Sequence, residues 1–550
     1  MPRIPRERRP IVSKHEGGLH YFHPDWIEPS DKLITVDVCI YGGTSAGVVA
    51  AATLAQRGHS VVVLNPGRHL GGMSSGGLGW TDFGRKQAIG GASLRFYQRV
   101  GKHYGKDAEW CFEPRVAEAA FEQIIQEAGV TVHQAQFLHR VEMDGQRIIE
   151  VTMLGGLRCR ATVFLDATSA GDLLAQSVVA FAFGREPNAT YGETLGGIQV
   201  MGGHQFSHRV DPFITPGDPT SGLLPQVEMV DQTRHLGRGD HRVQAYNFRV
   251  CMTDDPALKV DWQRPQRFDD SLYTLARRWF AGEKDNYNEQ VKGPHNMVGV
   301  PVPSKFDVFP NKTAGGFHKT DTNNHGPVSS DFIGMSWAWP HATYAQREEL
   351  FQQHVAYQQG LYWVLANDPA VPSKYRDAYR HWGLPRDEFT DTGHWPHQLY
   401  IREARRMVGD YVITEHDCRA TRRAEDSIGL GSYNMDSHNC TRFVTWIDGQ
   451  AWVKNDGDVQ VPPTDPYPVS YRCVVPAKGQ CNNLIVPVCF SASHIAYGSA
   501  RMEPVFMVLA ESCGLAASVA LRDNCSVQDV PYAKLRALLE EAGQVLAWTK

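Results

Sequence analysis

One segment near the start constrains the fold more than any other: an apolar run, then a glycine-rich turn, then a helix. Residues 36–41 are mostly apolar, and the turn at 42–47 reads Gly-Gly-Thr-Ser-Ala-Gly. An alanine-rich helix is predicted over 48–57, Gly58 ends it, and residues 60–64 predict another strand. This order predicts a βαβ unit that opens a parallel α/β sheet.

The turn resembles a phosphate-binding motif. The N-terminus of the helix that follows the turn would offer free N–H groups and a positive dipole end to a pyrophosphate. Gly42 and Gly47 fill the first and third positions of G-x-G-x-x-G, whereas Thr44 fills the second, and Gly43 can supply the missing clearance. Asn65 stands where an acid would bind the ribose. A glycine turn in a non-nucleotide α/β fold is the alternative interpretation.

A second glycine-rich loop follows at 71–79, with the sequence Gly-Gly-Met-Ser-Ser-Gly-Gly-Leu-Gly. Such a density of glycine lets backbone lie close against a flat ligand. Alone, the segment could be a flexible loop. Behind a dinucleotide motif, it is typical of flavin binding.

The composition and the predicted secondary structure change twice along the chain. Strand signals continue over 130–183, and the stretch 202–461 is rich in Trp, Pro, Asn, Asp and His. From about Tyr471 the α/β texture returns, with a strand at 484–488 and an Ala/Gly/Ser-rich helix. We predict an α/β fold in which a Rossmann-like nucleotide domain is built from both ends of the chain around an inserted α+β substrate or cap domain. The predicted parts are an N-terminal arm (1–34), the nucleotide domain (35–200 and 466–528), the insertion (201–465) and a C-terminal surface helix (529–550).

Composition excludes several classes of function. The 550 residues carry 55 Lys and Arg against 60 Asp and Glu, a net charge of −5, so no basic excess favours nucleic acid. No uninterrupted apolar run approaches the roughly 18 residues of a membrane span. An odd count of 11 cysteines argues against a disulfide framework, and the basic start at 1–10 lacks the apolar segment of a secretory signal. We therefore expect a cytoplasmic protein, and its size favours a homodimer.

Several separate motifs match a known family in order. They are 41–47, 71–84, 164–168 with 171–172, 244–249, 321–324, 402–406, and 491–496 with Gly498 and Arg501. With these motifs the chain resembles FAD-dependent oxidoreductases that have a glutathione-reductase-type FAD domain, and more narrowly the subfamily labelled simply FAD-dependent oxidoreductase. The resemblance implies a Rossmann-like FAD-binding domain and redox chemistry, and most substrates in the subfamily are unassigned.

The same resemblance implies the cofactor contacts. The turn would face the pyrophosphate, Asn65 the ribose, the second loop the isoalloxazine, and the strand end at 166–168 the adenine half. Relatives often have a Gly-Asp pair near positions 487–489, where this chain has Pro487 and Cys489. The implied cofactor residues are Gly42, Gly43, Thr44, Ser45, Ala46, Gly47, Asn65, Gly71, Gly72, Met73, Ser74, Gly77, Asp166, Ala167 and Thr168.

Three residues are candidates for catalysis. A helix beginning near Pro504 would point its positive end at the flavin, and Arg501 just before it would add charge or bind an anionic substrate group. A structural salt bridge is the alternative for Arg501. His494 and His438 are candidate bases, because the ordinary pKa of histidine suits proton transfer near neutrality. The alternative for His494 is a hydrogen bond that holds the cofactor loop.

Two segments pair histidine with cysteine: Glu-His-Asp-Cys at 415–418 and Asp-Ser-His-Asn-Cys at 436–440. Both side chains are zinc ligands, but the spacing is unlike the usual knuckle, and we predict no metal. The segments are candidates for the substrate pocket, or for structural loops.

Aromatic and amide side chains in the inserted region favour a polar, sugar-like ligand. A polar core that joins long loops would have the same composition. The predicted substrate contacts are Tyr246, Asn247, Arg249, Asn324 and His416.

We therefore predict an FAD-dependent dehydrogenase or oxidase that oxidises a small polar substrate by hydride transfer to flavin N5. Its expected partner is that substrate, without nucleic acid or membrane. A flavin-dependent monooxygenase and a non-catalytic FAD-binding protein are the alternatives.

Overall fold

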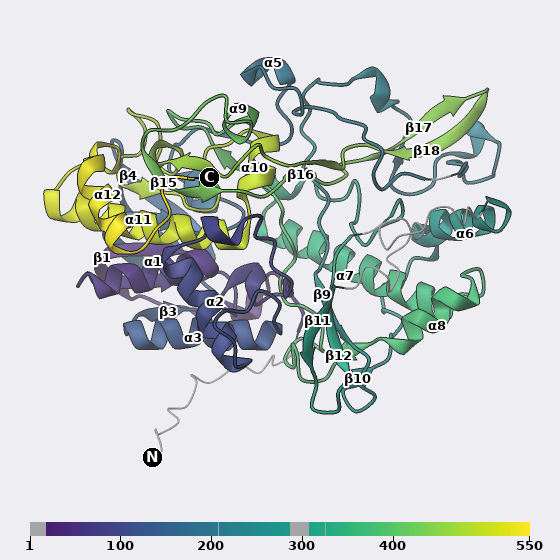
Figure 1. The fold of residues 1–550 in the computed structure, drawn as a ribbon, viewed down its shortest axis with the longest axis horizontal. Helices are drawn as coiled ribbons and strands as arrows, with labels where there is room; N and C mark the ends of the chain where they lie inside the picture. The colour runs from purple at the N-terminus through teal and green to yellow at the C-terminus, as the bar shows by residue number, and fades with distance from the viewer. Residues whose placement is uncertain (1–17, 207, 287–306, 325, 550) are drawn as a thin grey trace.

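The computed structural model describes residues 18–206, 208–286, 307–324 and 326–549. In Figure 1, the purple N-terminal elements and the yellow C-terminal elements lie together on one side of the molecule. The teal and green elements from the middle of the chain lie on the other side. Segments from the two ends of the sequence are therefore neighbours in space.

The larger sheet holds, in spatial order, β3 (Thr131–His133), β2 (Val61–Leu64), β1 (Leu33–Tyr41), β6 (Arg158–Asp166), β5 (Arg147–Met153) and β4 (Leu138–Asp144), with β21 (Leu484–Ile485) beside β6. Strands β3, β2, β1, β6 and β21 are parallel, whereas β5 and β4 form an antiparallel hairpin. Tyr41 is in register with both Leu64 and Asp166, so three carboxyl ends meet at one edge. The predicted βαβ unit and the mixed α/β fold are confirmed.

Helices α1 (Ser45–Gln56) and α11 (Glu503–Asp523) contact strands of this sheet. Three further helices, α2 (Gly91–His103), α3 (Pro114–Ala128) and α12 (Tyr532–Glu541), pack on these two, and α10 (His494–Ala500) packs against β16 (Met435–Ser437). Helix α11 packs on α1, and one hydrophobic core joins side chains of residues 38–167 to those of residues 411–539. Among the described residues, α11 alone is long and apolar enough to cross a membrane, but 89% of that stretch is buried inside the protein. Burial on all sides within the protein explains why this helix is apolar all round.

The predicted boundaries differ slightly from the structure. Helix α1 begins at Ser45, because the side chain of Thr44 caps it by accepting from the N–H of Gly47 at 3.3 Å. Strand β21 ends at Ile485, two residues before Pro487, which has no N–H for a ladder. Strand β1 begins inside the predicted arm, and α12 lies inside the predicted C-terminal helix. Residues 1–17 of the arm lie outside the described residues.

The middle of the chain forms a second hydrophobic core between residues 206 and 453. Its main elements are α6 (Thr274–Asn286), α7 (Tyr344–Asn367), α8 (Ser373–His381), the sheet β11 (Asp307–Lys312), β12 (His318–Thr322) and β9 (Val250–Thr253), and the sheet β18 (Gln450–Asn455), β17 (Arg442–Ile447) and β8 (Val227–Glu228). Short elements complete the fold: α4 (Asp172–Gln176), α5 (Asn188–Tyr191), α9 (Glu415–Cys418), β7 (Phe181–Ala182), β10 (Lys259–Val260), β13 (Leu384–Pro385), β14 (Arg406–Met407), β15 (Ser427–Gly431), β16 (Met435–Ser437), β19 (Val459–Val461) and β20 (Tyr467–Ser470).

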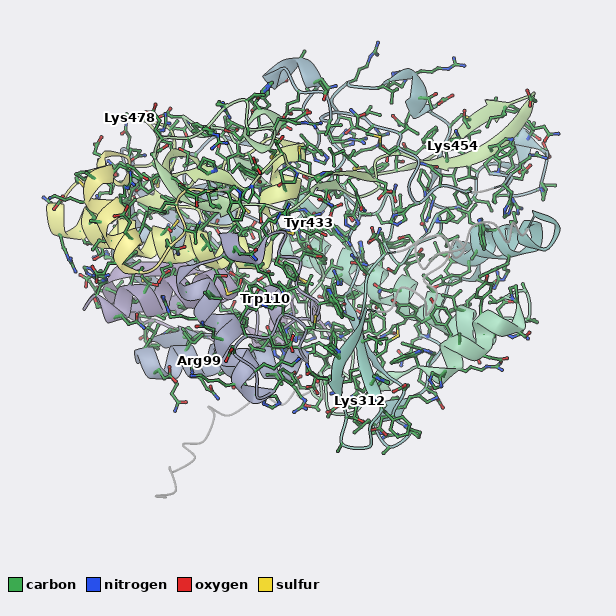
Figure 2. All side chains as sticks on the ribbon, viewed as in Figure 1. Arg99, Trp110, Lys312, Tyr433, Lys454 and Lys478 are labelled. Atoms are coloured by element: carbon green, nitrogen blue, oxygen red, sulfur yellow. The ribbon has the colours of Figure 1, made fainter. Side chains whose placement is uncertain are left out.

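Most cysteine side chains lie inside the protein, whereas many charged side chains lie at its surface. All 11 cysteines lie in the described part of the chain, and there they form no disulfide; ten are buried. Lys478 lies at the outer edge of the molecule, and Lys454 lies on β18 (Figure 2).

Candidate functional site

A cavity lies at the carboxyl ends of β1, β2 and β6. We call it cavity 1. It is lined by four groups of residues: 42–44 and 65–69; Gly72; 168–170 and Asp172; and 391–392 with 397–399 and Ile401. The N-terminal residues Gly18, His20, Tyr21 and Trp26 complete the wall together with Phe137 and Phe351.

The first glycine turn leaves bare backbone facing this cavity. Gly42 has a φ of +111°, and a Cβ on it would lie 2.8 Å from the carbonyl carbon of Ala167. A Cβ on Gly47 would lie 1.9 Å from the oxygen of Gly42, so glycine is required for α1 to pack against the turn. The N-terminus of α1 therefore lies next to the cavity, with its first N–H groups lacking partners within the helix. This arrangement suits an anion such as a phosphate.

The side chain of Asn65 holds two loops together. Its Oδ1 accepts from the N–H of Gly43 at 2.9 Å, and its Nδ2 donates to the carbonyls of Gly67 and His69 at 3.0 and 2.9 Å. Both donors of the amide are thus engaged by backbone. Asn65 lines cavity 1, and its contact with a ribose stays a prediction.

At the end of β6, one residue faces the cavity and two support it. Asp166 accepts from the N–H and hydroxyl of Thr168 at 3.0 and 2.6 Å and from the N–H of Leu174 at 2.8 Å. Burial raises the pKa of Asp166 to about 6. The hydroxyl of Thr44 donates to the oxygen of Ala167 at 2.7 Å. Only Thr168 of the predicted 166–168 set lines cavity 1.

The second glycine loop connects cavity 1 to a smaller one, cavity 2. Gly72 lines cavity 1, and Met73 lines cavity 2. Gly71 has a φ of +101°, and a Cβ on it would lie 2.3 Å from the ring of Phe121. Gly77 has a φ of +130°, and its Cβ would lie 2.1 Å from the oxygen of Arg249. Both glycines are needed for packing, neither lines cavity 1 or cavity 2, and their contact with FAD stays a prediction.

Cavity 2 lies at the N-terminus of α11. It shares Ser169 and Ile401 with cavity 1, so the two cavities adjoin. The remaining lining residues are Met73, Leu78, Asp82, Tyr400, Arg402, Val488, Tyr497, Arg501, Met502, Glu503 and Phe506. The helix predicted to start near Pro504 does begin at this cavity.

The region where relatives have Gly-Asp is apolar here. Val488 lines cavity 2, and the thiol of Cys489 donates to the oxygen of Thr168 at 3.3 Å. Cys489 therefore secures the end of β6 from behind, and Pro487 is buried beside it.

Arg501 joins cavity 2 to a buried polar network. Its NH1 donates to the hydroxyl of Tyr400 at 3.1 Å, and its NH2 donates to Oε1 of Gln244 at 3.1 Å. The same NH2 lies 3.3 Å from Oδ2 of Asp436. Within the part of the chain that the structure describes, Nε of Arg501 has no acceptor. The salt bridge anticipated for Arg501 and its place at the cavity are thus both present.

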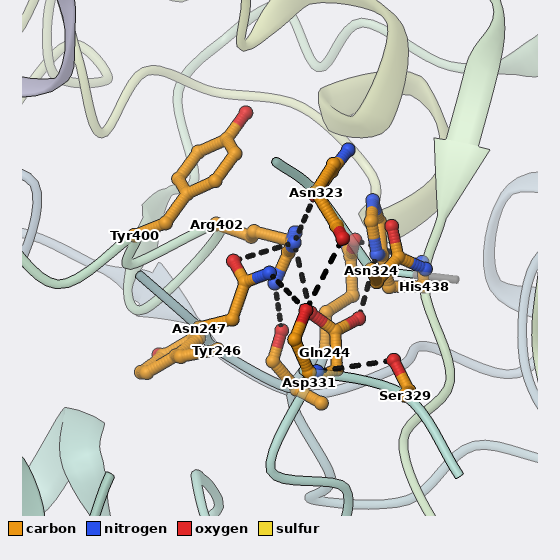
Figure 3. A network of polar contacts seen from close by, with 12 residues as sticks. Gln244, Tyr246, Asn247, Asn323, Asn324, Ser329, Asp331, Tyr400, Arg402 and His438 are labelled. Carbon is orange, nitrogen blue, oxygen red and sulfur yellow. Dashed lines mark hydrogen bonds and ion pairs between the residues drawn. The ribbon is translucent and has the colours of Figure 1, made fainter. Parts of the chain in front are cut away.

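His438 lies deeper in this network (Figure 3). Its Nδ1 donates to Asp331 at 2.9 Å, and its Nε2 lies 3.4 Å from Asp436. Arg402 lies 3.0 Å from the other oxygen of Asp331, and its guanidinium lies over the ring of Tyr400 at 4.6 Å. A chain of polar contacts thus runs from Tyr400 through Arg501 and Asp436 to His438. It continues from His438 through Asp331 to Arg402.

His494 does not reach either cavity. It is the first residue of α10, with its Nδ1 2.9 Å from Oε2 of Glu403 and its Nε2 2.8 Å from the hydroxyl of Ser437. Both ring nitrogens are therefore engaged by buried protein groups. This geometry matches the alternative in which His494 holds a loop.

None of the predicted substrate residues of the insertion lines either of these two cavities; His416 is half-buried, and the other four are buried. Asn247 and Asn324 are close to the network in Figure 3. The partners are the carbonyl of Glu403 for Tyr246, Arg402 at 3.0 Å for Asn247, Asp321 at 2.9 Å for Arg249, and His204 at 3.2 Å for Asn324. The alternative of a polar core that joins loops fits these contacts, and substrate contact stays a prediction.

The two His-x-Cys segments do not share a site. His416 donates from Nε2 to the oxygen of Tyr191 at 3.1 Å, and the thiol of Cys440 lies 3.8 Å from the oxygen of His438. Burial raises the pKa of Cys418 to about 12. A thiol that resists ionisation is a poor zinc ligand.

A carboxylate cluster lies elsewhere, formed by Glu113, Asp387 and Glu388. The ammonium of Lys319 lies among them, at 3.0, 2.8 and 2.8 Å from their oxygens. Lys319 thus occupies the position that a cation would take, and it joins β12 to the loop before α3.

Sequence reasoning missed Tyr400, Arg402 and Glu503 as cavity residues. The hydroxyls of Ser45 and Ser74 donate to Oε2 of Glu503 at 2.5 and 2.9 Å. Burial raises the pKa of Glu503 to about 7. An acidic residue directly before Pro504 was a visible signal, because such acids favour helix N-termini.

The sequence profile of the family described as FAD dependent oxidoreductase matches residues 37–539. The chain belongs to this family. Its cofactor is therefore FAD, and the family resemblance drawn from the motifs is confirmed. No curated protein sequence matches this FAD-dependent oxidoreductase.

Solved structures of flavoenzymes resemble part of this FAD-dependent oxidoreductase. The anhydrotetracycline hydroxylase OxyS from Streptomyces rimosus is 14% identical over 28% of this chain and 36% of its own, with a TM-score of 0.21. The amino acid oxidase NikD is 16% identical over 28% of this chain and 56% of its own, with a TM-score of 0.22. A 3-ketosteroid dehydrogenase from Rhodococcus jostii is 14% identical over 25% and 46%, with a TM-score of 0.19. The alignments thus span less than two thirds of each of these proteins.

Proposed function

We propose that this protein is an FAD-dependent dehydrogenase or oxidase that oxidises a small polar, sugar-like substrate at cavity 2. The observation that carries this proposal is the position of Tyr400, Arg402 and Arg501 at the N-terminus of α11, beside a cavity that adjoins the glycine turn. When bound, FAD accepts a hydride at N5.

The residues of the two cavities fit FAD. Bare backbone at Gly42, Gly43 and Gly72 beside the N-terminus of α1 would hold the pyrophosphate in cavity 1. The isoalloxazine would then lie toward cavity 2, beyond Met73. In this arrangement, both ends of the chain build a Rossmann-like FAD-binding domain, and the insertion 201–465 covers it as the substrate domain.

Buried donors without acceptors support a ligand at cavity 2. Within the described residues, the Nε–H groups of Arg402 and Arg501 have no acceptor. A buried donor left unpaired costs free energy, so an oxygen-rich ligand that accepts these hydrogen bonds would be favoured. A hydroxylated substrate and the flavin carbonyls are both ligands of this kind.

Proton handling falls to the network behind the cavity. Tyr400 lines cavity 2, and burial raises its pKa while Arg501 partly offsets that rise. The hydroxyl of Tyr400 would take part in proton transfer with the substrate, and Arg501, which donates to that hydroxyl, would hold it in place while Asp436 and His438 orient Arg501. We favour His438 over His494 as the histidine that acts on the cavity, because Asp436 alone separates His438 from Arg501, whereas both Glu403 and Gln244 separate His494 from it.

The first test is an absorbance spectrum of the purified protein before and after acid precipitation. Flavin that moves to the supernatant means non-covalent FAD, and flavin that stays in the pellet means a covalent link. A colourless protein that takes up no FAD would overturn the proposal.

The second test is anaerobic reduction of the bound flavin by sugars, amines and hydroxy acids. We expect one class to bleach the flavin, and Tyr400→Phe to slow bleaching about 10²-fold or more, as loss of an acid–base group does. Flavin that dithionite reduces and no metabolite does would favour the non-catalytic alternative. Substrate-dependent NAD(P)H consumption would favour the monooxygenase.

A further inference from the structure

The N-terminal segment 18–26 is docked onto the fold and forms one wall of cavity 1. Gly18, His20, Tyr21 and Trp26 line the cavity together with residues 42–44 of the glycine turn. The guanidinium of Arg68, another lining residue, lies over the ring of Trp26 at 5.2 Å. The chain therefore passes along cavity 1 before it enters β1.

One carboxylate on α7 holds this segment. Oε2 of Glu348 accepts from the backbone N–H groups of Tyr21 and Phe22 at 2.7 and 2.9 Å. Its Oε1 lies 2.6 Å from Nδ1 of His20. One turn further along α7, Gln352 donates to the carbonyl of Leu19 at 2.6 Å. Hydrogen bonds to an ionised carboxylate are stronger than those between neutral groups, so Glu348 supplies the main polar attachment.

Aromatic contacts complete the docking. The ring of Tyr21 lies edge-on to Trp339 at 5.0 Å, and the ring of Phe22 lies edge-on to Phe137 at 4.9 Å. The attachment thus joins the middle of the chain, through α7, to a wall of cavity 1. A ligand in cavity 1 is enclosed between this segment and the glycine turn.

We propose that residues 18–26 are a retaining strap for FAD: docked on α7 through Glu348, they close cavity 1, and their undocking sets the rate at which FAD leaves. The proposal rests on the placement of FAD in cavity 1. A ligand that binds only the closed state stabilises it, so FAD binding and strap docking favour one another.

The test is the rate constant of FAD release from the holoenzyme after dilution, followed by flavin fluorescence. Glu348→Ala removes the carboxylate that binds the strap, and we expect release at least about tenfold faster, because interface changes act mostly on dissociation. Glu349→Ala is the matched control. Glu349 is the next residue on α7, is exposed, and pairs with Arg267 outside the cavity. We expect that control to release FAD at the wild-type rate. Equal release from both variants would overturn the proposal.

Hydrogen exchange on the wild-type protein gives a second, independent readout. Saturating FAD should slow exchange of the peptide that contains the N–H groups of Tyr21 and Phe22, and Glu348→Ala should abolish that protection. Exchange that is the same with and without FAD would overturn the strap even if Glu348→Ala does not fold. A wild-type protein that binds no FAD would instead overturn the proposed function, so the two failures are distinguishable.

Discussion

The hydroxyl of Ser45 donates a hydrogen bond of 2.5 Å to the carboxylate of Glu503. Ser45 is the first residue of α1 and Glu503 the first residue of α11. The positive ends of two helices therefore meet at one carboxyl group, which lines cavity 2. Negative charge is favoured at such ends, and burial opposes it. Glu503 is thus held where the protonation state of one group affects both helices.

Glu503 should make the protein less stable as the pH rises. Burial raises its pKa from 4.5 to about 7, and the hydroxyls of Ser45 and Ser74 only partly offset this. The folded state then binds more protons than the unfolded state between these values, so its stability falls from pH 4.5 to pH 7. Glu503→Gln should remove up to about 3 kcal/mol of that fall. Urea unfolding across this range measures it. Glu540→Gln, an exposed helix position, is the control, and an unchanged slope in Glu503→Gln would contradict the prediction.

His69 should also make the protein less stable as the pH rises, but over a higher pH range. Burial disfavours its charged form, but hydrogen bonds to Asp391 and Glu118 more than offset this and raise its pKa to about 9. Its stabilising contribution is therefore complete below pH 6.5 and is lost as the pH rises through 9. His69→Gln should flatten the decline of stability between these values, by up to about 3 kcal/mol. Urea unfolding with saturating FAD measures this, and the exposed His139→Gln should keep the wild-type slope. Parallel pH profiles for wild type and His69→Gln would refute the assignment.

A side chain on Gly43 should weaken FAD binding. An added Cβ would lie 2.7 Å from Cγ of Asn65 and 2.8 Å from Cδ2 of Leu70, so Asn65 must move and release the N–H of Gly43. We expect Gly43→Ala to raise the Kd for FAD about tenfold or more, since overpacking costs roughly 1–3 kcal/mol. A flavin titration measures the Kd. Gly202→Ala is the control, because its Cβ would meet nothing within 4 Å. Equal affinities would show that the turn does not contact FAD.

Lys319 should be essential for stability. Its side chain is 3% exposed, and its ammonium lies within 3.0 Å of Glu113, Asp387 and Glu388. Lys319→Met leaves three carboxylates facing one another, and breaking a buried pair in this way costs about 3–5 kcal/mol. Urea unfolding of Lys319→Met against Lys312→Met, which replaces an exposed lysine on β11, measures the difference. A loss no greater than that of the control would mean that the cluster is neutralised by proton uptake, as the raised pKa of Glu388, about 7, would allow.

Local features of the fold could be predicted because their causes lie within a few residues. The steric clash that requires glycine at Gly47 arises from Gly42, five residues earlier, so the turn was visible in the sequence. The same is true of α11, which begins at a proline-containing first turn, and of α12, whose apolar spacing was regular. Motif order across the chain was sufficient for the family and for FAD.

The roles of single side chains could not be predicted in the same way. His494 and His438 were both predicted in loops or at strand ends, yet Asp436 alone separates His438 from Arg501 of cavity 2, whereas His494 reaches Arg501 only through Glu403 and Gln244. Both nitrogens of His494 meet Glu403 and Ser437, which are 91 and 57 residues away. Tyr400 lines cavity 2, although no sequence motif marked it as a site residue.

The sequence by itself determined the βαβ unit, the glycine turn, the family and the cofactor, because each depends on local sterics or on motifs in order. The tertiary structure decided which groups meet: Glu503 with Ser45, Lys319 with its three carboxylates, and Glu348 with the strap. These contacts join residues up to 458 positions apart. Burial and charge at such contacts depend on how the elements pack, and hydrophobic periodicity along the chain does not encode that packing.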